Sequence, residues 1–264
     1  MNKLLIILSL LTLSAQAQQY SFGWKSDPRH SKGLKQFVKT GLKAETIKPY
    51  SDLSPLLPPV YDQGAQGACT AHAGVAAFEL PWKQKHGKFL RGSRQGVYIY
   101  SLKHDGTYPN DAGSYISTTV WVMTNNGVGK ESCFPYVGYP SGPIPRCYEK
   151  DAAKNRLIQS YDVDSTDGKS IRIALSNGFT VMFGGYIYEA IISLKKPYIL
   201  PSPKGNPIGG HAMLIVGHDD AKKLYKVRNS WSTLWGEKGY FYIKYSDMHN
   251  PRIYEDFAAV QLTN

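Results

Sequence analysis

Cysteine is scarce in this sequence, with three among 264 residues, and no apolar run reaches the length of about twenty residues that a membrane-spanning helix needs. Internal repeats and low-complexity segments are also missing. Lysines and arginines outnumber acidic residues by 31 to 20, but they are scattered and form no long run or aromatic–basic pattern typical of nucleic-acid binding. These absences disfavour a transmembrane, repeat or nucleic-acid-binding protein, and a hydrophobic content of 42% favours a packed globular chain.

The first residues have the pattern of a secretory signal. Lys3 precedes an apolar stretch that extends to Leu13, and a small–x–small triplet, AQA, follows. We expect residues 1–17 to be cleaved near Ala17 and the mature chain to be secreted or periplasmic, without stable insertion into a membrane.

An odd number of cysteines in an exported chain predicts one disulfide and one free thiol. Cys133 and Cys147 flank a stretch rich in proline and glycine that can fold back on itself, which favours a bridge between these two. The alternative is that all three thiols are reduced and that two of them pack as small apolar residues. Cys69 lies in a different context and is the thiol expected to stay free.

The remaining sequence divides into an arm and a domain. Residues 18–57 form a basic arm without motifs, which could be a short pro-segment. Residues 58–264 are expected to form one domain with a helical half, about 58–150, and a strand-rich half, about 151–264.

Helical patterns come first in this domain and strand patterns follow. The alanine-rich sequence from Cys69 to Leu80 predicts a helix that Pro81 ends, and a weaker helix is expected over 116–123. Three segments rich in β-branched and aromatic residues then predict strands joined by hairpin turns, namely HAMLIVGHD, KLYKVRNSW and GYFYIKYS. This order predicts an α+β fold with a cleft where the two halves meet.

Cys69 has the local context of a reactive thiol. It follows the glycine-bearing loop QGAQGA and directly precedes the alanine-rich helix, so its side chain should lie at a helix N-terminus. Unpaired N–H groups there carry partial positive charge, which lowers the pKa of a thiol, and a neighbouring imidazolium lowers it further. The simpler alternative is a buried cysteine that packs as a small apolar residue.

His211 and Asn229 are expected to lie close together across a hairpin. Two glycines precede His211 at the start of a predicted strand, where they allow a ligand backbone to approach. If the turn is centred near residue 221, the two residues are two positions, or about 7 Å, out of register. An asparagine at that distance can accept a hydrogen bond from the imidazole and fix its tautomer. Alternatively, Asn229 caps a turn at the end of the strand.

Three sequence blocks together resemble the active-site blocks of papain-like cysteine peptidases, in particular the bacterial branch with a short pro-region. The blocks are YDQGAQGACTAHA, GGHAMLIVGHDD and VRNSWSTLWGEKGYFYI, in this order. A glutamine six residues before the cysteine, a Gly-His pair and an Asn-Ser-Trp triplet followed by WGxxGY form a specific combination. The resemblance implies the papain-like α+β fold, in which a helical half and an antiparallel β-barrel-like half enclose the active-site cleft.

The resemblance also implies a role for each matching residue. It implies that Cys69 is the nucleophile, that His211 is the general base and acid, and that Asn229 orients the histidine. Gln63 matches the glutamine whose amide, with the backbone N–H of Cys69, forms the oxyanion hole of the family.

Three further positions match the family. Trp231 matches the tryptophan that shields the asparagine–histidine hydrogen bond from water. Gly113 and Gly210 match residues whose backbones contact the bound peptide, although Ala112 stands where the family usually has a first glycine.

The sequence departs from the family pattern near the nucleophile. Gln66 replaces a disulfide cysteine of the family, which agrees with a pairing of Cys133 with Cys147. Thr70 and Ser232 replace a tryptophan and a glycine, and neither change removes a catalytic group. The arm is much shorter than the inhibitory pro-region of the lysosomal relatives, so both inhibition and removal of the arm stay open.

The sequence therefore predicts an exported cysteine peptidase that acts on peptides or proteins as a monomer, without a cofactor or bound nucleic acid. His72 should share a helical face with Cys69, but two ligands do not make a zinc site, and no metal is expected. The alternatives are a papain-fold protein that binds peptides without turnover and a transpeptidase that passes the acyl group to an amine. The intact catalytic set favours an enzyme over the first alternative.

Overall fold

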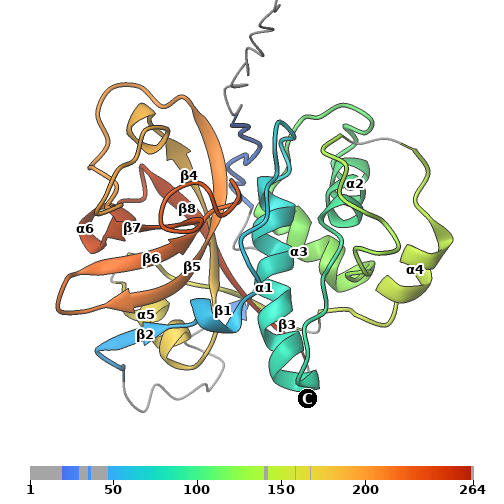
Figure 1. Ribbon diagram of the computed structural model, residues 1–264, viewed down its shortest axis with the longest axis horizontal. Helices are drawn as coiled ribbons and strands as arrows, with labels where there is room; N and C mark the ends of the chain where they lie inside the picture. The colour runs from blue at the N-terminus through green and yellow to red at the C-terminus, as the bar shows by residue number, and fades with distance from the viewer. Residues whose placement is uncertain are drawn as a thin grey trace, which may run out of the picture.

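Helices and strands occupy two halves of the molecule that pack side by side (Figure 1). The computed structural model describes residues 20–29, 35–36, 47–139, 142–157, 159–166 and 168–262. The expected signal, residues 1–17, lies outside these ranges. The α+β class predicted from the sequence is confirmed, and in the described residues most of the helices precede most of the strands along the chain.

The helical half contains α1 (Cys69–His86), α2 (Arg94–His104), α3 (Ile116–Asn125) and α4 (Arg146–Ala152). Helix α1 packs against α2 and α3 on one side and against β5 on the other, and it stands at the centre of Figure 1. Helices α1 and α3 match the two predicted helices, whereas α2 and α4 were not predicted. None of the described helices is long and apolar enough to cross a membrane.

Helix α1 does not end at Pro81, contrary to the expectation from the sequence. A proline in a helix interior removes one N–H donor and costs about 3 kcal/mol. Beyond Pro81, the Trp82 ring stacks on Phe78 with 5.9 Å between centroids and lies 3.9 Å from the His86 ring. These contacts stabilise the last turns, and the helix ends at Gly87, whose φ of +68° suits glycine.

The strand-rich half is built on one large sheet. The described residues form eight strands in the order β1-β3-β8-β4-β5-β6-β7, with β2 paired to β5 beside this path. Strand β1 is parallel to β3, and the other neighbours are antiparallel. The elements of this half are β1 (Lys35–Gln36), β2 (Tyr50–Asp52), β3 (Gln159–Asp162), α5 (Lys169–Ser176), β4 (Val181–Ile187), β5 (Gly209–Asp219), β6 (Leu224–Arg228), β7 (Tyr240–Lys244), α6 (Tyr245–Met248) and β8 (Tyr254–Gln261).

The last part of the N-terminal arm belongs to this sheet. Strand β2 pairs with β5, where Ser51 is opposite His218. The Ser51 hydroxyl donates a hydrogen bond to the Leu175 carbonyl, and Leu53 and Leu57 are buried in the core. The residues just before the expected start of the domain therefore pack as part of the strand-rich half.

A bulge in β5 sets the register of the β5–β6 hairpin. Ile215 pairs with Val227, but Gly217 pairs with Lys226, so β5 carries one extra residue between these pairs. Side chains alternate between the two faces of a strand, so a shift of one residue moves all following side chains to the other face. The bulge therefore decides which side chains share a face at the open end of the hairpin.

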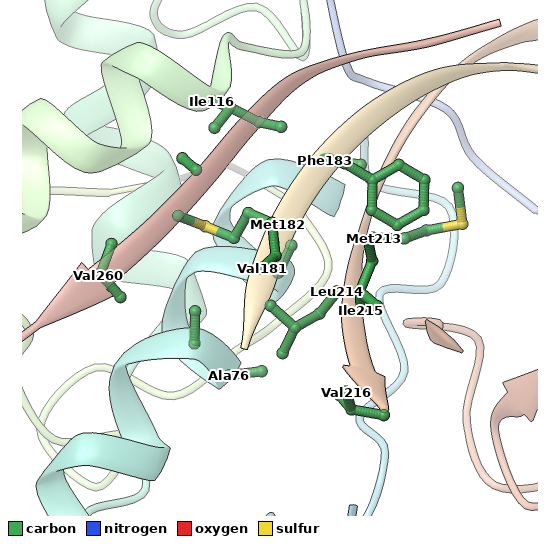
Figure 2. Close-up of a cluster of buried hydrophobic side chains, with 14 of the residues drawn as sticks. Ala76, Ile116, Val181, Met182, Phe183, Met213, Leu214, Ile215, Val216 and Val260 are labelled. Atoms are coloured by element: carbon green, nitrogen blue, oxygen red, sulfur yellow. The ribbon is translucent and has the colours of Figure 1, made fainter. Parts of the chain in front are cut away.

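The core lies between α1 and the sheet, as Figure 2 shows. Ala76 of α1 and Ile116 of α3 contribute to it from the helical half. Val181, Leu214 and Val260 contribute from β4, β5 and β8. All five side chains are at most 3% exposed, so the two halves share one continuous apolar interior.

Close packing of α1 against α3 predicts that Gly74 cannot gain a side chain. A Cβ atom at Gly74 would lie 2.5 Å from Thr119 Cγ2, and threonine has few alternative rotamers in a helix. Overpacking of this kind costs about 1–3 kcal/mol, against a gain of about 1 kcal/mol in helix propensity, so we expect Gly74→Ala to lower the free energy of unfolding by up to about 2 kcal/mol. The shift of the urea-denaturation midpoint measures this loss.

A second substitution checks the cause. Thr119→Ser removes Cγ2, so Gly74→Ala should cost less in a Thr119→Ser background than in the wild type. A Gly74→Ala variant that is more stable than the wild type would contradict the packing argument.

Candidate active site

Cys69 is the first residue of α1, as its sequence context predicts. Its side chain is fully buried, and the backbone N–H groups of Thr70, Ala212 and Gly23 approach the sulfur. Thr70 belongs to the same helix, Ala212 follows His211 on β5, and Gly23 comes from the N-terminal arm. The thiol thus lies where the helical half, the strand-rich half and the arm meet.

His211 and Asn229 form the hydrogen bond expected from the hairpin. The Nε2 atom of His211 lies 2.8 Å from Asn229 Oδ1. The backbone N–H of Ser230 donates to the same Oδ1 at 2.7 Å, and because an N–H can only donate, the atom that it meets must be the amide oxygen. Nε2 of His211 therefore carries the proton, and Nδ1 holds the lone pair of the neutral ring.

The strand register explains why these two side chains meet. Leu214 is opposite Arg228, so Asn229 falls opposite the residue two positions from His211 and shares its face. Without the extra residue of the β5 bulge, Asn229 would lie on the other face of the hairpin.

The Trp231 ring covers the His211–Asn229 pair. It stacks on the imidazole with 4.9 Å between the centroids and 27° between the planes. Trp235 packs edge-on against Trp231 at 5.2 Å. A hydrogen bond kept away from water is strengthened by the low local dielectric. This geometry agrees with the shielding role that the family resemblance implies for Trp231.

Ser230, a residue that no sequence pattern marked as functional, connects Gln63 to the same network. Its hydroxyl donates to Gln63 Oε1, and its carbonyl accepts from the Gln63 backbone N–H at 2.9 Å. The Gln63 amide is therefore turned so that Nε2 donates to the carbonyls of Ser21, at 3.1 Å, and Gln66, at 3.0 Å. The place of Ser230 inside the Asn-Ser-Trp triplet is the signal that could have identified it.

A stretch of the arm fills the space between the two halves. This cleft segment, residues 20–27, is drawn in dark blue near the centre of Figure 1. The Tyr20 ring lies 4.3 Å from the Trp231 ring, and the Phe22 ring lies 6.1 Å from both His211 and Trp231. The aromatic residues of the cleft segment therefore cover the candidate catalytic pair.

The backbone of the cleft segment pairs with both walls of the cleft. On the strand-rich side, the Trp24 N–H donates to the Gly210 carbonyl at 3.0 Å. On the helical side, the Ser114 N–H donates to the Gly23 carbonyl at 2.8 Å, and the Lys25 N–H donates to the Ser114 carbonyl at 3.2 Å. These bonds form an isolated parallel bridge between Trp24 and Ser114.

The two glycines expected to contact a bound peptide both contact the cleft segment. Gly210 does so through the carbonyl described above. Gly113 has a φ of +68°, and a Cβ atom there would lie 2.1 Å from the Gly23 carbonyl oxygen. Its N–H donates to the Tyr98 hydroxyl, so Ser114 rather than Gly113 forms the backbone pairs on this wall. Because Gly113 has no side chain, the backbone of the cleft segment can lie close to it at Gly23.

Burial under the cleft segment changes the acid–base state of the catalytic candidates. Burial raises the pKa of the Cys69 thiol to about 11, against the smaller opposing effect of the surrounding N–H groups. Burial also lowers the pKa of His211 to about 4, although its bond to Asn229 acts in the other direction. Both groups are neutral near neutral pH in this covered form. The thiolate expected from the helix N-terminus is therefore disfavoured here, because the sulfur is fully buried.

The other two cysteines lie together away from this site. The structure holds Cys69, Cys133 and Cys147 as free thiols, so the bridge predicted between the last two is not formed in it. Their side chains are nevertheless in hydrogen-bond contact, which raises the pKa of Cys133, and Cys147 Sγ lies 3.5 Å from the Cys133 carbonyl oxygen.

His72 is a buried helix residue without a catalytic partner. Its ring packs edge-on against Tyr136 at 4.8 Å. Burial, together with the charges of Arg94 and Arg228, holds the pKa of His72 well below its usual value, so the ring is neutral. In the part of the chain that the structure describes, no three His, Cys, Asp or Glu side chains come close enough to hold a metal ion.

Comparisons with known sequences point to one family. The pattern described as "Papain family cysteine protease" matches residues 44–260. An uncharacterized peptidase C1-like protein of Acanthamoeba polyphaga mimivirus is 28% identical over 214 residues, which cover 76% of this chain and 68% of that protein. A probable cysteine protease of Arabidopsis thaliana is 31% identical over 191 residues, which cover 70% of this chain. This chain spans about half of the length of the plant protein, 51%.

Comparisons with solved structures give the same fold. Xylellain, a cysteine protease from Xylella fastidiosa, matches with a TM-score of 0.82 and 26% identity, over 92% of this chain and 97% of that one. The digestive procathepsin L 3 of the Tenebrio molitor larval midgut matches with a TM-score of 0.68 and 19% identity, over 88% of this chain and 77% of that one. The papain-like architecture implied by the sequence is thus confirmed.

Removal of the aromatic contacts of the cleft segment should expose the thiol. Burial of each ring stabilises the covered form by about 1.5–3 kcal/mol, so Tyr20→Ala with Phe22→Ala should shift the equilibrium toward the open form. We expect Cys69 in this double variant to react with iodoacetamide at neutral pH at least about tenfold faster than in the wild type. Peptide mapping separates its signal from those of the other two cysteines.

Phe89→Ala is the matched control, because Phe89 is an exposed ring, 44% accessible, whose cation–π partner Lys83 belongs to α1 and not to the cleft segment. It should leave the alkylation rate of Cys69 unchanged. Equal rates in the double variant and the wild type would show that the cleft segment does not control access to the thiol.

Proposed function

The chain belongs to the papain family of cysteine proteases, and on this premise we propose that it hydrolyses peptide bonds through an acyl-enzyme on Cys69. The observation that carries the proposal is that a peptide backbone already lies at the site. The Ser21 carbonyl accepts from the Gln63 amide, and the Gly23 N–H lies at the Cys69 sulfur. A hydrogen-bond donor for a carbonyl beside a nucleophilic thiol is what acyl transfer requires.

In the proposed reaction, His211 Nδ1 takes the thiol proton while the Cys69 sulfur bonds to the carbonyl carbon of the scissile peptide. The imidazolium then gives that proton to the leaving amine as the C–N bond breaks. Water, which loses a proton to His211, attacks the thioester, and the proton returns to the sulfur as the acid product leaves. The Nε2 bond to Asn229 supports this role because it keeps Nδ1 free for proton transfer.

Gln63 Nε2 and the Cys69 backbone N–H are the proposed oxyanion donors. The hydroxyl of Ser230, which donates to Gln63 Oε1, supports this assignment because it turns the amide nitrogen toward the bound carbonyl. A preorganised donor of this kind lowers the barrier by about 3–4 kcal/mol.

We also propose that the cleft segment inhibits the enzyme until it is displaced. Its backbone takes the hydrogen-bonding groups of both cleft walls, and the Ser21 carbonyl takes the Gln63 donor. Burial under the segment keeps Cys69 and His211 neutral, as their shifted pKa values indicate. Displacement of the segment would both admit a substrate and return water to the thiol.

Labelling of the thiol with an epoxysuccinyl-type inhibitor tests the peptidase function. We expect the Tyr20→Ala, Phe22→Ala variant to gain the mass of one inhibitor molecule and to cleave casein. The adduct and the cleavage should both disappear when Cys69→Ser or His211→Ala is added, because each removes one member of the proton-transferring pair.

The outcomes separate the alternatives. A variant with a free, accessible Cys69 that neither takes the label nor cleaves casein would contradict the peptidase function. Peptide binding without cleavage would favour the binding-protein alternative, and capture of the acyl group by an added amine in preference to water would favour the transpeptidase.

We further propose that the chain is exported and that Cys133 and Cys147 form a bridge after export. The signal-like pattern of residues 1–17 supports export, and the hydrogen-bond contact between the two thiols supports the bridge.

Protein recovered from the periplasm or medium of an expressing bacterium should begin near Gln18 and titrate as a single free thiol in denaturant. Cys147→Ser should raise the titrated thiols to two, because Cys133 then loses its partner. An intact Met1 on the recovered protein would contradict export, and three free thiols in the wild type would contradict the bridge.

A further inference from the structure

Asp111, in the loop between α2 and α3, is bonded to the loop that leads to the nucleophile. Its two carboxylate oxygens share the Gly67 N–H, at 3.1 and 3.0 Å, and Oδ1 also accepts a hydrogen bond from the Tyr98 hydroxyl. These partners are 44 and 13 residues away in the sequence, so Asp111 does more than form a turn with its own neighbours. It joins three segments of the chain at a point two residues before Cys69.

The peptide group between Gln66 and Gly67 is held at both of its polar atoms. Its N–H donates to Asp111, and its oxygen, the Gln66 carbonyl, accepts from Gln63 Nε2 at 3.0 Å. A peptide group is planar, with the N–H and the carbonyl on opposite sides, so a rotation of this group breaks both bonds together. Asp111 therefore opposes any rotation that would take the carbonyl away from Gln63.

The Gln66 carbonyl in turn decides where the Gln63 amide points. An amide nitrogen carries two N–H groups at a fixed angle. One of them donates to Gln66, so the other is directed at the Ser21 carbonyl, at 3.1 Å, which occupies the place of a substrate carbonyl under the proposed function. Ser230 fixes the oxygen end of the same amide. Asp111 thus acts on the proposed oxyanion donor through a single peptide group.

The Tyr98 hydroxyl extends the same restraint to the helical wall of the cleft. It donates to Asp111 and accepts from the Gly113 N–H at 3.1 Å. Burial, together with the bond to Asp111, raises the pKa of Tyr98, so the hydroxyl keeps its proton and can form both bonds. A Cβ atom at Gly23 would lie 1.9 Å from the Gly67 carbonyl oxygen, and one at Gly113 would lie 2.1 Å from the Gly23 carbonyl oxygen. Asp111 and Tyr98 therefore tie together two stretches that a backbone in the cleft contacts.

We propose that Asp111 is a positioning residue, which orients the Gln66–Gly67 peptide and through it the Gln63 amide. This inference rests on the proposed peptidase function and adds to it a residue that acts through Gln63 rather than on the reacting atoms. A carboxylate suits this role because hydrogen bonds to an ionised acceptor are about twice as strong as neutral ones. Its two oxygens can also accept from an N–H and a hydroxyl at the same time.

Kinetics of an open form of the chain test this role. The background carries Tyr20→Ala and Phe22→Ala, and cleavage of a fluorogenic peptide is followed. A misdirected oxyanion donor affects the transition state more than the bound substrate, so Asp111→Ala should lower kcat about tenfold or more and change KM by less than about twofold. Asp111→Asn keeps one acceptor oxygen, and its kcat should therefore fall only about threefold.

A double-mutant cycle distinguishes positioning from a general effect on the fold. If Asp111 acts through the Gln63 amide, Asp111→Ala should lower kcat less than about twofold once Gln63→Ala is present. A tenfold fall that persists in the Gln63→Ala background, or an unchanged kcat in the Asp111→Ala variant, would overturn the proposal.

Asp164→Ala is the matched control. Asp164 is exposed, as Asp111 is, and it also accepts from one backbone N–H and one hydroxyl. Both of these donors belong to Thr166, two residues away, so Asp164 joins no distant segments. Its substitution should leave kcat within about twofold of the value for the open form.

Alkylation of Cys69 in the otherwise intact chain gives a readout that does not need turnover. There the Gln63 amide donates to the Ser21 carbonyl, so Asp111→Ala should loosen the cleft segment and raise the rate of reaction with iodoacetamide about threefold or more. With Gln63→Ala present, the same substitution should raise the rate less than about twofold. Equal rates in Asp111→Ala and the wild type would overturn the proposal. If no peptide is cleaved but alkylation shows this dependence on Gln63, the peptidase function fails while the positioning by Asp111 stands.

Discussion

The hydrogen bond between His211 Nε2 and Asn229 Oδ1 holds the site together, and it depends on the register of one hairpin. The extra residue in β5 keeps both side chains on the same face. The next two residues then add their own contacts: Ser230 fixes the amides of Asn229 and Gln63, and Trp231 covers the imidazole. Three consecutive residues directly after β6 thus contact the imidazole and the Gln63 amide, the groups to which the proposed function assigns proton transfer and oxyanion binding.

The cleft segment closes this site largely with backbone groups, and closure also changes the charge of what it covers. A thiolate and an imidazolium are stabilised either by solvent or by each other's charge. Burial removes the solvent and therefore favours the neutral forms of Cys69 and His211. Steric exclusion and loss of nucleophile are therefore one physical event. On the proposed function, displacement of the segment would return water to Cys69 and His211 and so restore their ionised forms.

The three catalytic candidates were predictable because each stands in a local pattern, a loop before a helix for Cys69 and two ends of a hairpin for His211 and Asn229. The count through the hairpin succeeded although the true turn centre lies half a residue later, because the bulge restores the register. The path of the cleft segment was not predictable, because pairing through the backbone leaves no pattern of side chains. The space for the Trp24 ring likewise comes from two glycines, Gly184 and Gly210, that have no side chain to fill it. The continuation of α1 past Pro81 likewise depends on ring contacts that only the folded chain provides.

The way in which the cleft segment is attached determines how tightly it has to bind. It ends at residue 27, and the same chain pairs with the sheet again at β1 (Lys35–Gln36) and at β2, from Tyr50. A ligand tethered by a short linker has an effective concentration on the order of millimolar, so contacts of only micromolar intrinsic affinity would keep it bound about a thousand times more often than free. A single cut in the connecting chain would dilute the segment to its bulk concentration. The same contacts between the segment and the cleft would then be too weak to keep it bound. Hydrolysis of one peptide bond outside the site would therefore act as an irreversible switch.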